Sequence, residues 1–455
     1  MAYLIGIAAL ILGLLVSIAL HEIGHMVPAK AFGVKVPQYF VGFGPTLWST
    51  RRGETEYGIK AIPLGGYVRL AGMFPPEPQA STDAPDHPNP EMSREPVDGV
   101  APAPEHTAHQ ATSVQAATRT RRTLAEQARY ESSLDLAPGE HDRALYALSV
   151  PKKIAVMVGG PLMNLVIAFV LFAVILMGWG LPAPSTTLSD VPECRSQTSP
   201  CADPSPAYEA GLRAGDTITA YGGSSVDTWE DLTAAIAAGG GAPARVDYVS
   251  HGHPASAEVT PVRIEATADA PERYVIGVVA GSERRTTGVG TVFSITGTAV
   301  KETLGVIVKL PMRLYDVAVS TVTGTPREDG VMSIVGVGRV AGEVASTMPT
   351  TDDQGRVIDA PTFGERAMTM LSLLASLNIA LFAFNLIPLP PLDGGHIAGA
   401  LWEGARRQVA RLRGKSDPGP VDMARLLPLT YTVFFALIIM TVLLGYADIV
   451  NPVTF

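Results

Sequence analysis

Two histidines and a glutamate stand close together early in the chain, in the run His21-Glu22-Ile23-Gly24-His25. Positions i and i+4 lie on the same face of an α-helix, so this spacing lets two imidazoles bind one metal ion with a carboxylate nearby. Imidazole is a common zinc ligand, and a carboxylate beside zinc can accept a proton from the attacking water. The run therefore predicts a hydrolytic zinc site with His21 and His25 as ligands and Glu22 as the base.

A third ligand must come from elsewhere, because catalytic zinc takes three protein ligands and keeps one position open for water. The best candidate is Asp393, in the run NLIPLPPLDG at 385–394, where three prolines prevent a continuous helix. An aspartate at membrane depth is tolerated only where it is buried in protein or faces a cavity or a metal. His396 follows three residues later. A fourth protein ligand would close the water position, so we expect His396 to lie around the zinc without binding it.

Four segments are apolar enough, and long enough, to cross about 30 Å of hydrocarbon, and 47% of the 455 residues are hydrophobic. We expect transmembrane helices over 3–20, 154–181, 368–387 and 427–444. The first segment has no basic start and no small-residue cleavage site, so we expect it to be retained. The metal motif would then lie at the end of a transmembrane helix, where ionisable side chains are costly and rarely lack a function.

Basic residues gather after the first helix and between the last two, so positive-inside reasoning places both of these segments in the cytoplasm and both termini outside. The basic residues are Lys30, Lys35, Arg51, Arg52, Lys152, Lys153, Arg406, Arg407, Arg411, Arg413, Lys415 and Arg425. The net charge of -9 is spread through the soluble parts, and no basic stripe indicates nucleic-acid binding.

The segments between the apolar helices differ in composition and in residue pattern. Residues 37–72 read as short strands with glycine turns, which predicts a small membrane-associated sheet. The glycine-rich strands around Gly65 and Gly66 could bind a substrate by strand addition. Residues 74–150 hold many prolines and charges and few β-branched or aromatic residues, so we expect a mostly disordered cytoplasmic linker.

The segment 183–283 has the pattern of a compact α/β domain, and its run AGLRAGDTI resembles PDZ domains of the bacterial protease type. Cys194 and Cys201 lie close together on the expected outer side, which permits a disulfide or two free thiols. The following residues alternate apolar and polar positions at helical spacing. This pattern predicts amphipathic helices on the outer membrane surface or an ordinary soluble helical cap.

The expected fold is a polytopic α-helical membrane protein with four transmembrane helices, a small membrane-associated β-sheet and one extracytoplasmic PDZ-like α/β domain. Its segments are transmembrane helix 1 with the metal motif (1–28), the β region (29–73), the linker (74–150), helix 2 (151–182), the PDZ-like domain (183–283), the amphipathic region (284–366), helix 3 with the aspartate motif (367–400), a cytoplasmic loop (401–426) and helix 4 (427–446).

These motifs together resemble the site-2 protease family of intramembrane metalloproteases, in its bacterial branch with an inserted PDZ domain. The resemblance rests on HEIGH, PLGGYVRLAG, GGPLMN, the PDZ-like segment and NLIPLPPLDGGH. It implies that His21, His25 and Asp393 bind Zn²⁺, that Glu22 is the catalytic base, and that Asn164 and Asn385 lie close to the substrate backbone. Bacterial relatives often carry two tandem PDZ domains, whereas only one is recognisable here, so the resemblance says less about how substrates are admitted.

The expected function is intramembrane proteolysis. The substrate would be a single-pass membrane protein, such as an anti-sigma factor already clipped on its outer side, or a leftover signal peptide, reached through the surrounding membrane lipid. The alternative is a catalytically idle zinc-binding scaffold that holds partners with its PDZ-like domain, but metal storage would not need Glu22. A zinc transporter would need a polar path, and the other helices carry almost no ionisable residues.

Overall fold

The computed structural model describes residues 2–76, 123–195, 203–265, 272–325, 332–346, 350–351, 357–358 and 361–451. The chain divides into two compact units, Met1–Leu171 with Ile295–Phe455, and Phe172–Ser294.

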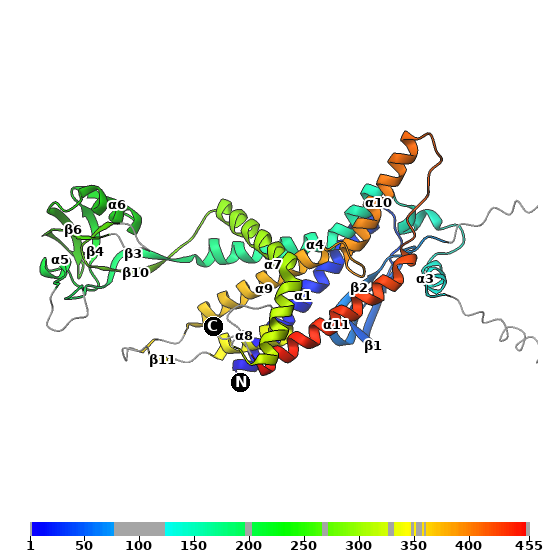
Figure 1. Ribbon diagram of the computed structural model, residues 1–455, viewed down its shortest axis with the longest axis horizontal. Helices are drawn as coiled ribbons and strands as arrows, with labels where there is room; N and C mark the ends of the chain where they lie inside the picture. Colours follow the sequence, from blue (N-terminus) through cyan, green and yellow to red (C-terminus); the bar gives the residue numbers. More distant parts are fainter. Residues whose placement is uncertain are drawn as a thin grey trace, which may run out of the picture. The chain divides into compact units, whose positions relative to one another are not determined.

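Five helices in the described part of the chain are long and apolar enough to cross a membrane (Figure 1). They are α1 (Ala2–Ala31), α4 (Val150–Ala173) with its π-helical continuation (Val174–Trp179), α7 (Val289–Thr323), α9 (Phe363–Asn385) and α11 (Leu427–Val450) with a preceding 3-10 turn (Met423–Leu426). The expectation of a multi-pass membrane protein is met. The number of four spans is not confirmed, because α7, expected to be amphipathic, also meets these criteria.

Glycines let α1 and α4 approach each other closely at the level of the metal motif. A Cβ added to Gly24 would lie 2.3 Å from the carbonyl oxygen of Gly159, and one added to Gly159 would lie 2.0 Å from the carbonyl oxygen of Gly24. Any larger residue at either position would push the two helices apart. The glycine pair therefore fixes α4 against the turn of α1 that carries the histidines.

Helix α9 packs beside the first half of α1 through a buried polar contact. Asn378, fully buried, donates to the hydroxyl of Ser17 at 3.0 Å, and the Ser17 hydroxyl in turn donates to the carbonyl of Gly13 at 3.0 Å. This contact forms only where Asn378 lies level with Ser17, so it fixes how α1 and α9 lie along each other. Helix α8 (Ile334–Ser346) packs on the N-terminal end of α1, where a Cβ on Gly6 would lie 2.6 Å from the carbonyl oxygen of Ala341.

Two long bent strands, β1 (Gln38–Arg52) and β2 (Thr55–Arg69), form the predicted small sheet. The first four residues of β1 pair with 56–59 on one side and with 66–69 on the other, while 46–52 pairs with 55–60. Residues 66–69 thus form an edge of the sheet. Tyr39 ties the sheet to α1, because its hydroxyl donates to the carbonyl of Ala19 at 2.9 Å.

The predicted linker differs from the structure over 123–150, and 77–122 lie outside the described residues. Helix α3 (Leu124–Ser133) begins with a capping box between Thr123 and Glu126, and two 3-10 turns follow (His141–Arg143 and Leu145–Ala147). Ion pairs bind this segment to the rest of its unit: Lys35–Glu140, Arg69–Asp135, Arg143–Glu54 and Arg129–Asp422.

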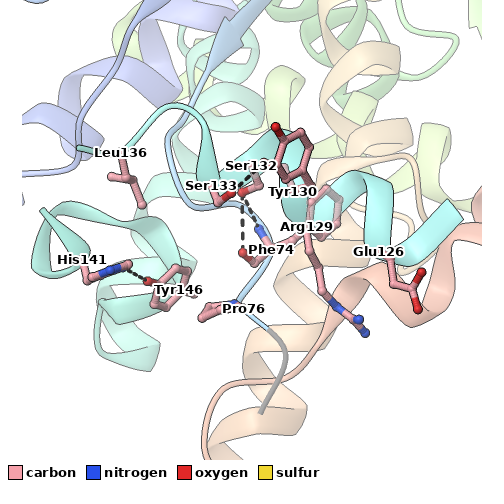
Figure 2. Close-up of a pocket in the computed structure, with 10 residues that line it drawn as sticks. All are labelled: Phe74, Pro76, Glu126, Arg129, Tyr130, Ser132, Ser133, Leu136, His141 and Tyr146. Atoms are coloured by element: carbon pink, nitrogen blue, oxygen red, sulfur yellow. Dashed lines mark hydrogen bonds between the residues drawn. The ribbon is translucent and has the colours of Figure 1, made fainter. Parts of the chain in front are cut away.

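The Lys35 ammonium and the Ala137 backbone N–H hold the pKa of Glu140 at about 2, so this carboxylate is charged at neutral pH. A pocket of about 230 Å³ lies between α3 and the turns. Phe74, Tyr130 and Tyr146 are among the residues that line it (Figure 2). The group of possible metal ligands found in the described part of the chain does not line this pocket.

Helix α10 (Asp393–Leu412) follows the proline run and joins α4 through a buried ion pair. The Lys153 ammonium donates to both carboxylate oxygens of Glu403 at 2.8 Å, and these side chains are only 10% and 3% exposed. Glu403 also accepts from Arg407 at 3.1 Å and from the Val421 backbone N–H at 3.1 Å. The pair holds the start of α4 against the middle of α10.

The second unit contains a six-stranded sheet in the order β10-β3-β4-β6-β7, with β5 on β4. The strands are β3 (Leu181–Asp190), β4 (Thr217–Tyr221), β5 (Ser224–Ser225), β6 (Ala244–Ser250), β7 (His253–Val259) and β10 (Val279–Arg285). Short helices α5 (Pro206–Glu209) and α6 (Trp229–Gly239) and the pair β8 (Val262–Ile264) and β9 (Arg273–Val275) complete the unit, and β11 (Thr350–Thr351) pairs with β12 (Val357–Ile358) in the first unit.

The core of the second unit is apolar and includes Leu188, Leu212, Ile218 and Leu232. Its helix α6 begins at a capping box, in which Thr228 and Asp231 form both hydrogen bonds. The unit is thus a compact body of strands and short helices. Its PDZ character stays a prediction.

The Lys153–Glu403 pair gives a test of the packing. In Glu403→Gln the buried Lys153 ammonium loses its counter-charge, so we expect a loss of about 3–5 kcal/mol in the free energy of unfolding. Adding Lys153→Met removes the unpaired charge and should restore most of this loss. Titration of the purified protein with SDS, followed by circular dichroism, measures both changes. A double variant no more stable than the single one would contradict the assignment.

Candidate metal centre

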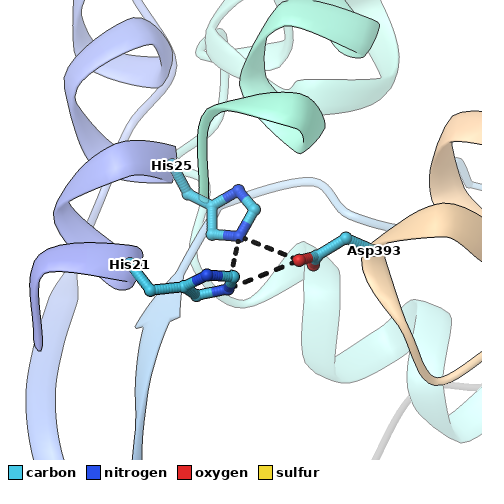
Figure 3. Close-up of side chains that lie close together, drawn as sticks. All are labelled: His21, His25 and Asp393. Carbon is cyan, nitrogen blue, oxygen red and sulfur yellow. Dashed lines mark hydrogen bonds and ion pairs between the residues drawn. The ribbon is translucent and has the colours of Figure 1, made fainter. Parts of the chain in front are cut away.

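The two histidines reach the same point from successive turns of α1. His21 and His25 are four residues apart, and their Nε2 atoms lie 3.3 Å from each other (Figure 3). Their side chains are 12% and 6% exposed, respectively. The spacing in the sequence thus produces the predicted pair of converging imidazoles.

Asp393 arrives from the other end of the chain through a tight turn. Helix α9 ends at Asn385, and Asp393 is the first residue of α10. A Cβ on Gly394 would lie 2.2 Å from the carbonyl oxygen of Ile387, and one on Gly395 would lie 2.6 Å from the backbone nitrogen of Pro390. The two glycines therefore allow the chain to fold back on itself and to point the aspartate towards α1.

The three side chains meet with nearly equal separations. Asp393 Oδ2 lies 3.4 Å from His21 Nε2 and 3.3 Å from His25 Nε2. These separations are longer than charge-assisted hydrogen bonds of about 2.7–2.9 Å. They agree with the separation of about 3.3–3.4 Å between ligand atoms placed tetrahedrally at zinc bond lengths of about 2.0–2.1 Å.

In the described part of the chain, this is the group of histidine, cysteine and acidic side chains whose ligand atoms lie close enough to hold a metal ion. Asp393 Oδ2 is buried, yet it accepts no hydrogen bond from the described residues. A buried carboxylate oxygen is ordinarily satisfied by a donor or a cation. The donor set of two imidazoles and one carboxylate therefore fits a catalytic zinc ion with one open position.

Residues of helix α4 contact the Nδ1 atoms of both histidines. His25 Nδ1 donates to the carbonyl of Val156 at 2.8 Å, which leaves Nε2 as its lone-pair atom. The helix also passes very close to this ring, because a Cβ on Gly160 would lie 2.1 Å from His25 Nε2. A fixed tautomer and a fixed ring direction are what a metal-binding histidine needs from its surroundings.

Asn164, on the same helix and 1% exposed, lies against the other histidine. Its Nδ2 is 3.1 Å from His21 Nδ1, while its buried Oδ1 has no hydrogen-bond partner among the described residues. Rotation of the amide by 180° would let Oδ1 accept the Nδ1–H of His21, which satisfies the oxygen and frees Nε2 for a metal. Asn164 therefore contacts a predicted ligand, and its role as a substrate contact stays a prediction.

Glu22 lies between the histidines in sequence and faces the sheet. The backbone N–H of Val68 on β2 interacts favourably with its carboxylate. A Cβ added to Gly66 would lie 3.4 Å from Glu22 Cγ and 3.3 Å from Ile18 Cγ2, so β2 runs directly beside the base. The sheet thus places both a polar contact and an open strand edge next to Glu22.

The sequence also predicts roles for Asn385, His396 and Gly65. Asn385 is half-buried at the end of α9, and His396 lines a small cavity of about 40 Å³ with Lys153 and Glu403. Gly65 has a φ of +100° in the bend of β2, a conformation that favours glycine. Cys201 lies outside the described residues, so its disulfide with Cys194 stays a prediction.

Sequence reasoning missed three groups that shape the centre. Nothing in the sequence marks the carbonyl of Val156, because every residue carries one. Asn378 and Lys153 could have been found, since polar residues in apolar helices are rare and usually have a partner. Their partners, however, are 250 or more residues away along the chain.

Comparison with known proteins agrees with this geometry. The sequence profile described as peptidase family M50 matches residues 9–416. Zinc metalloprotease Rip1 of Mycobacterium tuberculosis is 33% identical over 484 residues, covering 100% of this chain and 99% of the relative. Zinc metalloprotease RasP of Shouchella clausii is 27% identical, with 86% of this chain and 88% of the relative covered. Metalloprotease MmpA of Caulobacter vibrioides is 25% identical, with coverages of 90% and 89%.

The contact between Asn164 and His21 can be separated from a role in substrate binding. We expect Asn164→Leu to weaken zinc binding by about 10–100-fold, because His21 loses the partner that orients it. Asn164→Asp keeps an acceptor for the Nδ1–H and should retain zinc. Asp393→Ala, which removes a predicted ligand, should lose zinc altogether. Zinc content after dialysis against a graded series of chelator concentrations measures all three. An Asn164→Leu protein that holds zinc like the wild type would exclude the positioning role.

Proposed function

This chain belongs to peptidase family M50 and is a zinc metalloprotease of the intramembrane site-2 type, and we propose that its zinc is held by His21, His25 and Asp393 with Glu22 as the catalytic base. The observation that carries this assignment is the meeting of three ligand atoms 3.3–3.4 Å apart, supplied by both ends of the chain. Zinc bound there would polarise the peptide carbonyl and make a water molecule acidic enough to attack it.

The chain's own residues would perform the remaining steps. The carboxylate of Glu22 accepts a proton from the attacking water and can then deliver it to the leaving amide nitrogen. The Val68 N–H keeps this carboxylate turned towards the strand edge. Val156 and Asn164 hold the imidazoles in place throughout, so the geometry need not reorganise during the reaction.

Substrate binding would use the edge of β2. A peptide bond in a helix has both polar groups engaged, so the substrate must unwind before it is cut. Neighbouring residues of a strand direct their backbone groups to opposite sides. Because the Val68 N–H reaches Glu22, the backbone groups of Gly66 point to the same side, away from β1. An unwound substrate segment added there would satisfy its backbone inside the membrane and pass beside the base. Asn385, the last residue of α9 and eight residues before Asp393 in the chain, would add a contact to the substrate backbone.

We place the membrane crossings at α1, α4, α9 and α11. Contacts support this assignment, because both α1 and α9 begin near α8: Arg366 donates to the carbonyl of Ala345, which also lies beside Gly6. The last turn of α7 meets the end of α11, where the Asn451 amide donates to the carbonyl of Thr325 at 2.8 Å. The chain therefore leaves α4 and enters α9 at the same membrane face. If α7 also crossed the membrane, the chain would need another crossing between α7 and α9 to return to that face.

In this topology the metal centre lies towards the cytoplasmic side, and the second unit lies outside. We propose that the second unit is a PDZ-like domain that filters substrates by the size of their outer domains. A groove of about 280 Å³ runs between α6 and residues 274–278, lined by Trp229, Ile236 and Ile276 among others. The substrates would be single-pass membrane proteins already clipped outside, such as an anti-sigma factor, or signal-peptide remnants. The competing function, an idle zinc-binding scaffold, leaves Glu22 and its Val68 contact without a purpose.

Replacing the base tests the mechanism. Glu22→Gln keeps all three proposed ligands, so the purified protein should hold zinc in full. It should lose nearly all cleavage, because a neutral amide cannot accept the proton. Zinc analysis and digestion of a transmembrane test substrate in detergent measure the two properties on one sample. Wild-type turnover by Glu22→Gln would refute the proposed base, and loss of zinc would show that the carboxylate is needed to build the site.

Removing the second unit tests the filter. Ala183 pairs with Glu283 across β3 and β10, so 183–282 can be cut out and the neighbouring ends joined by a short glycine linker. We expect zinc binding to persist and unclipped substrates to be accepted along with clipped ones. The ratio of cleavage rates for the two substrates should fall towards one. If that ratio keeps its wild-type value, the second unit is not the filter.

A further inference from the structure

A groove of about 450 Å³ lies at the end of α10, far along the helix from Asp393. One wall is a single face of the helix, formed by Trp402, Arg406, Val409 and Arg413 at spacings of four, three and four residues. The other wall is the chain that returns after the helix, including Lys415 and Pro418. The Arg406 guanidinium donates to the carbonyl of Pro418 at 3.0 Å and so holds the two walls together.

Three basic side chains line the groove, and no acidic side chain is among its lining residues. No ion pair forms between Arg406, Arg413 or Lys415 and an acidic side chain of the described residues. The two acids of this region are engaged elsewhere: Glu403 binds Lys153 and Arg407, and Asp417 lies 3.3 Å from Arg407. The groove therefore has a net charge of +3 and attracts an anion.

Apolar side chains lie beside these cations. Trp402 is 62% exposed and Leu412 is 79% exposed, with Val409 half-exposed in the groove itself. Exposed tryptophan is typical of the interface between membrane and water, and basic residues at that depth bind anionic headgroups. A soluble anion would use the charges but leave the tryptophan and the aliphatic side chains without a partner.

We propose that this groove binds the headgroup and upper acyl chains of an anionic phospholipid, in the leaflet next to the end of α10. The phosphate contacts Arg406, Arg413 and Lys415, and the acyl chains lie along Trp402 and Val409. Asp393 is the first residue of the same helix, so a lipid held here fixes the depth of α10 in the membrane and with it the depth of the aspartate. In the proposed topology this is the cytoplasmic leaflet, whose anionic lipids attract basic segments.

Native mass spectrometry of the full-length zinc protein in mild detergent tests the site. With equal amounts of phosphatidylglycerol and phosphatidylcholine, we expect the anionic lipid to be retained about tenfold or more over the neutral one. Arg406→Gln/Arg413→Gln/Lys415→Gln should reduce this preference to near one. The matched control, Arg51→Gln/Arg52→Gln/Arg411→Gln, removes the same charge from outside the groove and should keep it. Equal loss in both variants, or no loss in the first, overturns the proposal.

A second measurement separates a lipid from a free anion and does not depend on the triple variant. In nanodiscs, phosphatidylglycerol with brominated chains should quench the Trp402 fluorescence, taken as the difference between wild type and Trp402→Phe, more strongly than brominated phosphatidylcholine. Glycerol phosphate at the same concentration should not displace the lipid. Equal quenching by the two lipids, or displacement by glycerol phosphate, overturns the proposal. Proteolysis is not read in either experiment, so failure here leaves the proposed function untouched.

Discussion

The close approach of α1 and α4 at Gly24 and Gly159 is the contact on which the rest of the metal centre depends. A Cβ at either residue would lie only 2.0–2.3 Å from the carbonyl oxygen of the other, so the helices would have to separate. Only at this distance can the Val156 carbonyl accept from His25 and the Asn164 amide reach His21. Two glycines that carry no chemistry of their own thus determine the direction in which both imidazoles point.

Buried polar pairs then fix the other helices around this contact. Asn378 aligns α9 with α1 through Ser17, and Glu403 aligns α10 with α4 through Lys153. An apolar helix in lipid gains little from choosing one alignment over another, because lipid chains are as apolar as leucine. A polar pair in the same surroundings is satisfied in one arrangement only. These pairs therefore give the bundle the precision with which Asp393, at the start of α10, meets α1.

The sheet adds what the helices cannot provide. Helices in a membrane have no free backbone groups, whereas the edge formed by 66–69 has them, and its Val68 N–H reaches Glu22. The same short segment can therefore orient the proposed base and offer hydrogen bonds to an unwound peptide. The ion pairs from 123–150 bind this sheet and the turn at Asp422 into one unit, which extends the support for the centre well beyond its ligands.

Local chemistry in the sequence determined much of this protein. The i, i+4 histidines, the apolar segments, the Thr228 capping box and the proline-broken run before Asp393 each depend on neighbours within a few residues, so their structure follows from spacing alone. The sequence did not determine that 123–150 would dock, because that segment gains its stability from partners such as Glu54 and Asp422, far away in the chain. Nor did it reveal that Asn164 lies on His21, or that the Val156 carbonyl orients His25. Those contacts exist only once α4 lies against α1, and they depend on where two helices cross, which no local pattern of residues encodes.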